Sequence, residues 1–150
     1  MSLKEQLRAD LTDAMRAKDD VRRSTLRMAL TSVTNEEVAG KQVRELSDDE
    51  VLKVLARELK KRREAATAYA EAGHPDRAAS ELAEGAVLEA YLPAQLDDDE
   101  LVALVAAAIA ESGASGPQAM GQVMKVVQPK VAGRADGGRV AAEVKRQLTS

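Results

Sequence analysis

The sequence predicts an all-α, multihelical protein with a larger N-terminal helical subdomain and a small C-terminal helical subdomain. Apolar side chains recur three and four residues apart along most of the chain, and no stretch alternates as a half-buried strand would. Hydrophobic residues fill 45% of the 150 positions, yet Phe and Trp are absent and Tyr occurs only twice. The core must therefore be built from Ala, Val, Leu and Met, which lets helices approach one another closely.

Two helices are predicted before residue 41. Ser2 followed by Glu5 has the spacing of a capping box that opens the first helix. Its apolar stripe is formed by Leu3, Leu7, Leu11 and Met15. The helix is predicted to end near Lys18. Asp19 and Asp20 can cap the second helix, which Gly40 closes. The second helix has two possible inward faces, which are Val21, Met28 and Ser32, or Leu26, Leu30 and Val33.

A longer helix and a shorter one are predicted to follow. Ser47 and Glu50 repeat the capping-box spacing and open the longest helix, which runs to about Ala72. Its inward positions are Val51, Val54, Leu55, Leu59 and Arg62. The break 73–76 contains Gly and Pro, and the fourth helix then covers 76–91. Its predicted packing positions are Ala79, Leu82, Ala86 and Tyr91.

The segment 93–96 predicts a boundary between a subdomain at 1–93 and a second at 94–150. Asp97 with Glu100 then caps a fifth helix, which the turn 113–117 stops. Its apolar positions are Leu101, Leu104, Val105, Ala108 and Ile109.

Two short helices are predicted to meet in the tail. One has an apolar face made by Val123, Met124 and Val127 and is expected to be broken at 129–133. The other carries Val140, Val144 and Leu148 at helical spacing, after a hinge at 133–138.

Charge is distributed unevenly along the chain. The formal net charge is −3, but residues 116–150 hold six Lys or Arg and two acidic residues, a balance of +4, which leaves −7 for the rest. A basic surface on an acidic protein suggests a polyanionic partner. The basic residues of 57–63, by contrast, spread around their helix beside Glu58, and Arg22, Arg23 and Arg27 lie close to Asp19 and Asp20. Both of these clusters are interpreted as ordinary solvated faces.

The residues suggest neither a catalytic site nor a metal or cofactor site. Without cysteine there is no thiol nucleophile, disulfide or Cys-ligated metal, and the single histidine, His74, lies in a turn. No glycine loop for phosphate with Lys-Ser/Thr is present. The consecutive acids at 97–100 are explained by the positive end of a helix dipole. The start of the chain lacks an apolar signal core and no apolar run approaches membrane length, so we expect a cytoplasmic protein with no membrane partner.

The tail offers the best candidate binding residues. A phosphate could lie at the helix start near Gly137 and Gly138, contacted by Arg134 or Arg139. Asp136 could instead cap that helix and repel phosphate. Lys145 and Arg146, in the last turn, can complement the helix dipole without any ligand. The residues alone leave open whether the tail binds a polyanion or is merely basic. If it binds nucleic acid, the scarcity of aromatics favours a folded RNA such as tRNA over a single strand.

Several motifs together resemble the free-standing YqeY-like proteins of the GatB/YqeY family. They are Ser2–Leu7, Arg23–Met28, Leu46–Glu50, Tyr91–Leu96, Met120–Gly121 and Gly133–Gly137. The family is similar to the tail domain of GatB, a subunit of the glutamyl- and aspartyl-tRNA amidotransferase, and its members are all-α. The resemblance implies tRNA affinity rather than an active site. It also carries a family label of carbon–nitrogen ligase with glutamine as amido-N-donor. Relatives often have Lys where this chain has Gly138, which leaves Arg139 to compensate.

Three functions are thus considered. The first is a non-catalytic module that binds tRNA through Lys125, Lys130, Arg134 and Arg139 and assists an amidotransferase or another translation component. The second is a helical protein–protein interaction module without RNA binding, which docks through an apolar groove between the subdomains, with Met120, Val123, Met124 and Val127 as its expected lining. The third, an autonomous amide-forming enzyme, is the least favoured because no nucleophile, base or ATP motif is present.

Overall fold

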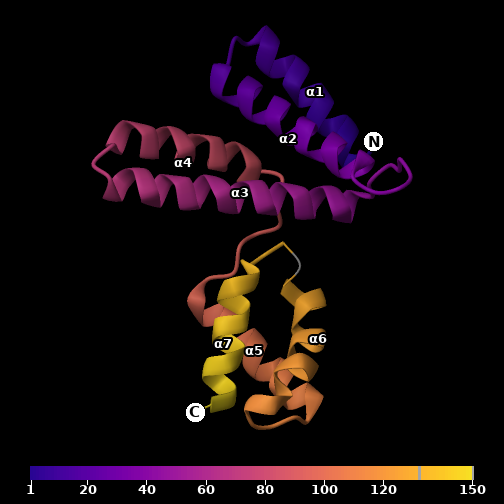
Figure 1. Cartoon of the computed structure of the whole chain (residues 1–150), viewed down its shortest axis with the longest axis vertical. Helices are drawn as coiled ribbons and strands as arrows, with labels where there is room; N and C mark the ends of the chain where they lie inside the picture. The colour runs from indigo at the N-terminus through magenta and orange to yellow at the C-terminus, as the bar shows by residue number, and fades with distance from the viewer. Residues whose placement is uncertain (132, 150) are drawn as a thin grey trace. The chain divides into compact units, whose positions relative to one another are not determined.

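The computed structural model describes residues 1–131 and 133–149, and over these it consists of helices without a strand (Figure 1). This confirms the predicted all-α class. The helices are α1 (Leu3–Arg16), α2 (Asp20–Val38), α3 (Asp48–Glu71), α4 (Pro75–Glu89), α5 (Asp98–Ser112), the 3₁₀ helix η1 (Pro117–Ala119), α6 (Met120–Val131) and α7 (Gly137–Thr149). Within the described residues, none of the helices has the length and apolar character needed to cross a membrane.

The chain divides into two compact units, each with its own hydrophobic core. Unit 1 is Met1–Leu92 and unit 2 is Pro93–Ser150. The core of unit 1 contains Leu7, Ala14, Leu26, Ala29, Val33, Leu46, Val51, Val54, Leu55, Leu59 and Leu88. The core of unit 2 contains Leu96, Leu101, Val105, Ala108, Ala119, Val123, Val127, Val131, Val140, Val144 and Leu148.

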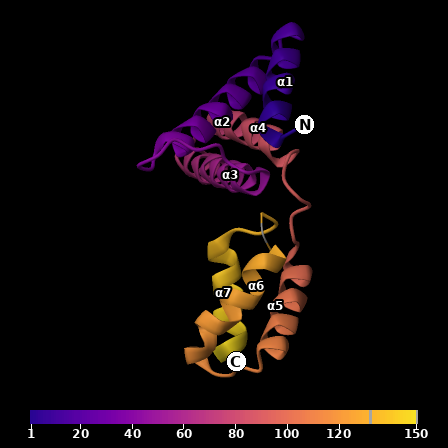
Figure 2. The ribbon, with the colours of Figure 1, turned by 90° about the vertical axis from the view of Figure 1, so that its right-hand side faces the viewer.

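Unit 1 is built from two helical hairpins. Helices α3 and α4 lie side by side, and the hairpin of α1 and α2 packs on them (Figures 1 and 2). The predicted capping boxes are present: the Ser2 hydroxyl accepts a hydrogen bond from the backbone N–H of Glu5 at 3.1 Å, and Ser47 accepts one from Glu50 at 3.3 Å. Asp19 caps α2. Each cap satisfies amides that would otherwise lack a partner at the helix start.

The two alternatives for α2 are resolved by its packing. Leu26 and Val33 are fully buried and Leu30 is half-buried, whereas Val21 is 43% exposed. The side of α2 that carries Leu26, Leu30 and Val33 therefore packs against the core, as the second alternative predicted. On α1 the predicted stripe is correct except at its end, where Met15 is 48% exposed.

The predicted packing face of α4 is wrong by about one residue. Ala79, Leu82 and Ala86 are exposed, and the buried positions are Ala78, Gly85 and Leu88. The physical reason is the packing of α4 on α3. Gly85 of α4 has no side chain, so the backbones of the two helices approach closely beside Leu59 of α3. Tyr91 is half-buried, as expected, and its hydroxyl donates to the Asp10 carboxylate.

Unit 2 is a small assembly of α5, α6 and α7 with η1 (Figure 2). Asp97 caps α5 as predicted, because its carboxylate accepts from the backbone N–H of Glu100 at 2.7 Å. Gly113 ends α5 in a left-handed conformation with φ 66°. The apolar faces of all three helices meet in one core.

The first tail helix ends within the segment 129–133 where a break was expected, but it does not end at Pro129. Pro129 lies inside α6, which continues to Val131. Proline removes one hydrogen bond of the last turn, but the buried side chain of Val131 holds that turn against the core. The hinge is also shorter than expected, because α7 already begins at Gly137 and the Asp136 carbonyl accepts its first helical bond, from Val140 at 3.0 Å.

Candidate nucleic-acid interface

The four candidate RNA-contacting residues lie on one helix, one turn and the start of a second helix, all in unit 2. Lys125 and Lys130 lie on α6 and are exposed. Arg134 follows Gly133 in the turn before α7, and Arg139 lies in the first turn of α7. Gly133 has φ 71°, in the left-handed region that suits glycine, and a Cβ there would lie 3.6 Å from the ring of Pro93.

The turn between α6 and α7 is tied to the segment that precedes α5. The Leu96 N–H donates to the Arg134 carbonyl oxygen at 2.8 Å, and the Gln95 amide donates to the Gly133 carbonyl oxygen at 2.8 Å. In return, the Arg134 Nε donates to the Ala94 carbonyl oxygen at 3.1 Å. The turn is therefore a fixed part of unit 2 that positions the start of α7.

Arg134 and Arg139, which were expected to contact phosphate, already make hydrogen bonds within unit 2. Arg139 donates through Nη1 to the Leu96 carbonyl oxygen and through Nη2 to the Asp98 carboxylate, both at 2.8 Å. Arg134 is anchored through Nε. These partners are backbone carbonyls and an acid about forty positions away, which no local pattern reveals. Both side chains stabilise the turn, and their contact with RNA remains a prediction.

The other cations of the tail differ in how they are engaged. Lys130 forms an ion pair with Glu111, and Arg146 contacts Glu143 through Nη2 at 2.7 Å. The Arg146 guanidinium and then the Gln147 amide hold the pKa of the Glu143 carboxyl below its ordinary value. Lys125 and Lys145 are exposed, and neither has an ion pair within the described part of unit 2. The sequence explained Lys145 by the helix dipole, and the structure adds that its side chain is exposed.

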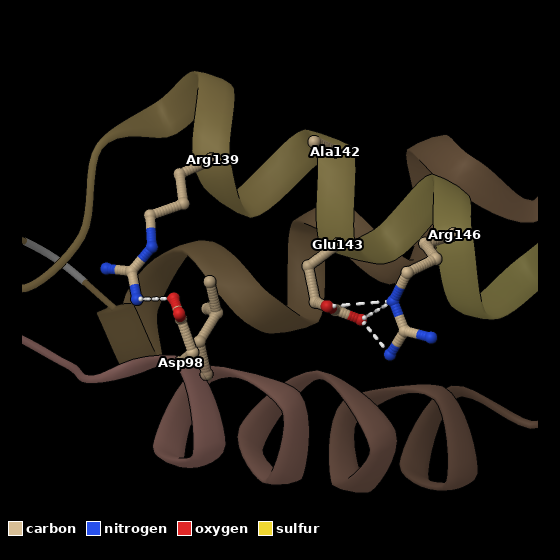
Figure 3. A pocket seen from close by; sticks show the side chains of 6 residues that line it. Asp98, Arg139, Ala142, Glu143 and Arg146 are labelled. Atoms are coloured by element: carbon tan, nitrogen blue, oxygen red, sulfur yellow. Dashed lines mark hydrogen bonds and ion pairs between the residues drawn. The ribbon is translucent and has the colours of Figure 1, made fainter.

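A shallow hollow of about 220 Å³ lies between α5 and α7 (Figure 3). It is lined by Asp98, Leu101, Arg139, Ala142, Glu143 and Arg146. Figure 3 shows that each arginine in it points to a carboxylate, so its charges are neutralised in pairs. The hollow therefore offers a bound anion no excess of positive charge. Across the described residues, no cluster of His, Cys, Asp or Glu is arranged to hold a metal ion.

Two of the four residues expected to line an apolar docking groove are buried in the core of unit 2. Val123 and Val127 are fully buried. Met120 and Met124 are half-buried and pack against the same core. The apolar face of α6 is thus used for folding, and its outer face is polar.

These features define an all-helical protein of two compact units, whose tail helices bury their apolar sides and expose lysines. The family of YqeY-like proteins matches residues 4–148, nearly the whole chain. The chain belongs to this family, which confirms the resemblance carried by its motifs. No curated protein is significantly similar to it.

Proposed function

We propose that the protein is a non-catalytic module that binds tRNA through the exposed basic residues of unit 2 and assists a glutamine-dependent tRNA amidotransferase. We call Lys125, Lys130 and Lys145 the lysine face, in which Lys130 would exchange its ion pair with Glu111 for a phosphate. The proposal assigns a binding role to these side chains. It assigns Arg134 and Arg139 mainly to positioning the turn that precedes α7.

The proposal rests on how the side chains of α6 and α7 are divided between the core and the surface. The apolar side chains of both helices are used in the core of unit 2, and the lysine face is exposed. A partner that docks on these helices therefore meets charge rather than an apolar groove. Phosphate groups suit exposed lysines, because each contact releases counterions from the RNA.

Family membership suggests which polyanion the positive charge of unit 2 binds. The similarity of YqeY-like proteins to the GatB tail suggests tRNA as the polyanion and an amidotransferase as the associated enzyme. We assign no amide-forming step to this chain, because it has no cysteine and its single histidine lies in the turn before α4. The outer guanidinium nitrogens of Arg134 can add a contact, since Nε alone binds Ala94 within the described residues.

Titration of the full chain with purified tRNA at several salt concentrations tests the proposal. The variant K125E/K145E should bind roughly tenfold or more weakly, because two phosphate contacts become two repulsions. K41E/K53E is the matched control, since Lys41 and Lys53 are exposed lysines of unit 1 and the change in net charge is the same. Equal weakening by both variants, or none by K125E/K145E, would exclude the lysine face as the binding site.

A further inference from the structure

The turn between α1 and α2 places a lysine in an unusual backbone conformation. Lys18 has φ 56°, and among the described residues it is the only residue other than glycine with positive φ. Its N–H donates to the Met15 carbonyl oxygen at 3.2 Å, and the next N–H, of Asp19, donates to Ala14 at 2.9 Å. This pair of bonds is the Schellman closure of a helix, in which the left-handed position is usually glycine.

The same closure occurs between α3 and α4, and there the chain uses glycine. Gly73 has φ 81° and its N–H donates to Ala70 at 3.2 Å, while the N–H of His74 donates to Tyr69 at 2.8 Å. Glycine adopts this conformation without the steric cost that a Cβ brings. Glycine at position 18 would therefore make the folded state more stable than Lys18 does. A residue that lowers stability in this way is typical of a position kept for function.

Two further exposed cations lie on the helices that Lys18 joins, Arg16 at the end of α1 and Arg27 in the third turn of α2, and we call Arg16, Lys18 and Arg27 the basic tip. Within the described residues, none of the three has an ion pair with a carboxylate. The nearest acids along the chain serve other purposes: Asp19 caps α2, and Asp20 pairs with Arg23 at 3.0 Å. Asp19 and Asp20 therefore form no ion pair with this cluster, although their charges still lower its positive potential.

The charge balance of the tip is positive and its surface is only partly apolar. Residues 13–27 hold five Lys or Arg and three Asp, a balance of +2 that counts Arg22 and Arg23 as well as the tip, and the exposed acids Asp13 and Asp20 weaken it. The Arg27 guanidinium lies 3.9 Å from the sulfur of Met15, a residue that is 48% exposed. Lysine is depleted in the core of protein–protein interfaces, whereas Lys and Arg are the usual contacts to phosphate.

We propose that the basic tip is a second contact for tRNA, which binds backbone phosphates through Arg16, Lys18 and Arg27. This inference rests on the proposed function and adds a site in unit 1 to the lysine face of unit 2. Binding at two sites on one chain would raise affinity by making the second contact intramolecular. The scarcity of aromatic side chains means that the contact reads charge and shape rather than base identity.

Replacing Lys18 separates a binding role from a structural one. K18G should raise the melting temperature, because glycine relieves the left-handed strain, and should weaken tRNA binding roughly threefold. K18R keeps the charge and should retain affinity. If K18G is more stable and binds tRNA as tightly as the original chain, the proposal is overturned, and an acidic protein becomes the better occupant for the tip.

The salt dependence of binding gives a second readout. R16Q/R27Q should reduce the slope of log K against log salt by about 2, whereas the control K41Q/K53Q should leave it unchanged. Because the chain has no cysteine, A17C can carry a photo-crosslinker at the tip, with A83C on the exposed side of α4 as control. Crosslinking of purified tRNA at A17C but not at A83C supports the proposal, and equal yields at both positions contradict it.

The outcomes distinguish this inference from the proposed function. If the original chain binds no tRNA, both are wrong. If K125E/K145E weakens binding and neither R16Q/R27Q nor K18G does, the lysine face stands and the basic tip is excluded. If only the variants of the basic tip weaken binding, the assignment of the site to unit 2 is wrong.

Discussion

The guanidinium of Arg139 lies 2.8 Å from the carbonyl oxygen of Leu96. Its second nitrogen lies 2.8 Å from the carboxylate of Asp98, at the start of α5. One side chain of α7 thus binds two groups at the start of α5. The carbonyl of Leu96 precedes that helix, and Asp98 is its first residue. The forked geometry of arginine suits this double contact, and a lysine could make only one of the two bonds well.

We predict that R139A lowers the free energy of unfolding by about 1 kcal/mol, a value reduced by the partial exposure of the pair. R139K should recover less than half of this loss. R146A is the matched control on α7, because Arg146 is more exposed and contacts Glu143 within its own helix. Thermal and urea unfolding of the three variants provide the measurement. Equal losses for R139A and R146A would show that the bond to Leu96 contributes little.

Local sequence patterns predicted the helices and their starts well. The caps at Ser2, Ser47 and Asp97 depend on a side chain and an amide three residues away, so the sequence contains all the information needed. The inward face of α4 could not be predicted in this way. Its buried side includes Gly85, which has no apolar side chain, and Glu81, whose partner Arg62 lies on α3.

The candidate site shows the same limit. The excess of positive charge in the tail can be counted from the sequence, but the partners of each cation cannot. Arg139 binds a backbone carbonyl 43 positions away, and Lys130 pairs with Glu111 on another helix. Which lysines remain available for a ligand is therefore a property of the tertiary structure.

The second capping box predicts a pH dependence of stability. The Arg44 guanidinium, 2.5 Å away, and then the Ser47 amide lower the pKa of the Glu50 carboxyl from 4.5 to about 2. Because the pKa is lower in the folded state, this contribution is present above pH 4.5 and is lost as the pH falls towards 2. E50Q should therefore melt below the original chain at pH 7, and the difference should shrink between pH 4.5 and pH 2.5.

E5Q is the control for this pH series. Glu5 makes the corresponding bond to the Ser2 amide at 3.0 Å, but within the described residues it has no ion pair. Its replacement should lower the melting temperature less than E50Q does at pH 7. A difference between E50Q and the original chain that stays constant down to pH 2.5 would contradict the predicted role of Arg44.

Gly85 tests how closely α3 and α4 pack. A Cβ at this position would lie 3.2 Å from Leu59 Cδ1 and 3.8 Å from Arg62 Cβ. G85A should be close to neutral, because alanine favours the helix by about 1 kcal/mol and a small movement of the flexible Leu59 offsets that gain. G85V should cost about 2–3 kcal/mol, since a branched side chain cannot fit without separating the helices. Urea unfolding compares them, and similar stability of G85V and G85A would show that the contact is loose.

Arg62 joins α3 to α4 through three carboxylates. Its guanidinium lies 3.3 Å from Glu58, 3.5 Å from Glu81 and 3.7 Å from Glu84, and the arginine side chain is only 23% exposed. Burial, and then the charge of Glu81, raise the pKa of Glu84 above its ordinary value. For Glu58, burial opposes ionisation, but hydrogen bonds led by Ser32 outweigh it and the pKa is lowered. Arg62 therefore allows these acids to ionise close together.

We predict that R62M lowers the free energy of unfolding by about 2–3 kcal/mol at pH 7, because the carboxylates lose their shared cation. Without Arg62 the pKa values of Glu58 and Glu84 rise, so the folded state of the variant takes up protons that the unfolded chain releases above pH 4.5. Its stability then falls as the pH rises, and the difference from the original chain should be larger at pH 7 than at pH 4.5. R63M is the control, because Arg63 pairs with Glu89 on the surface and should cost less than about 1 kcal/mol. A loss for R62M that is the same at both pH values would show that packing of the arginine stem, rather than its charge, joins the two helices.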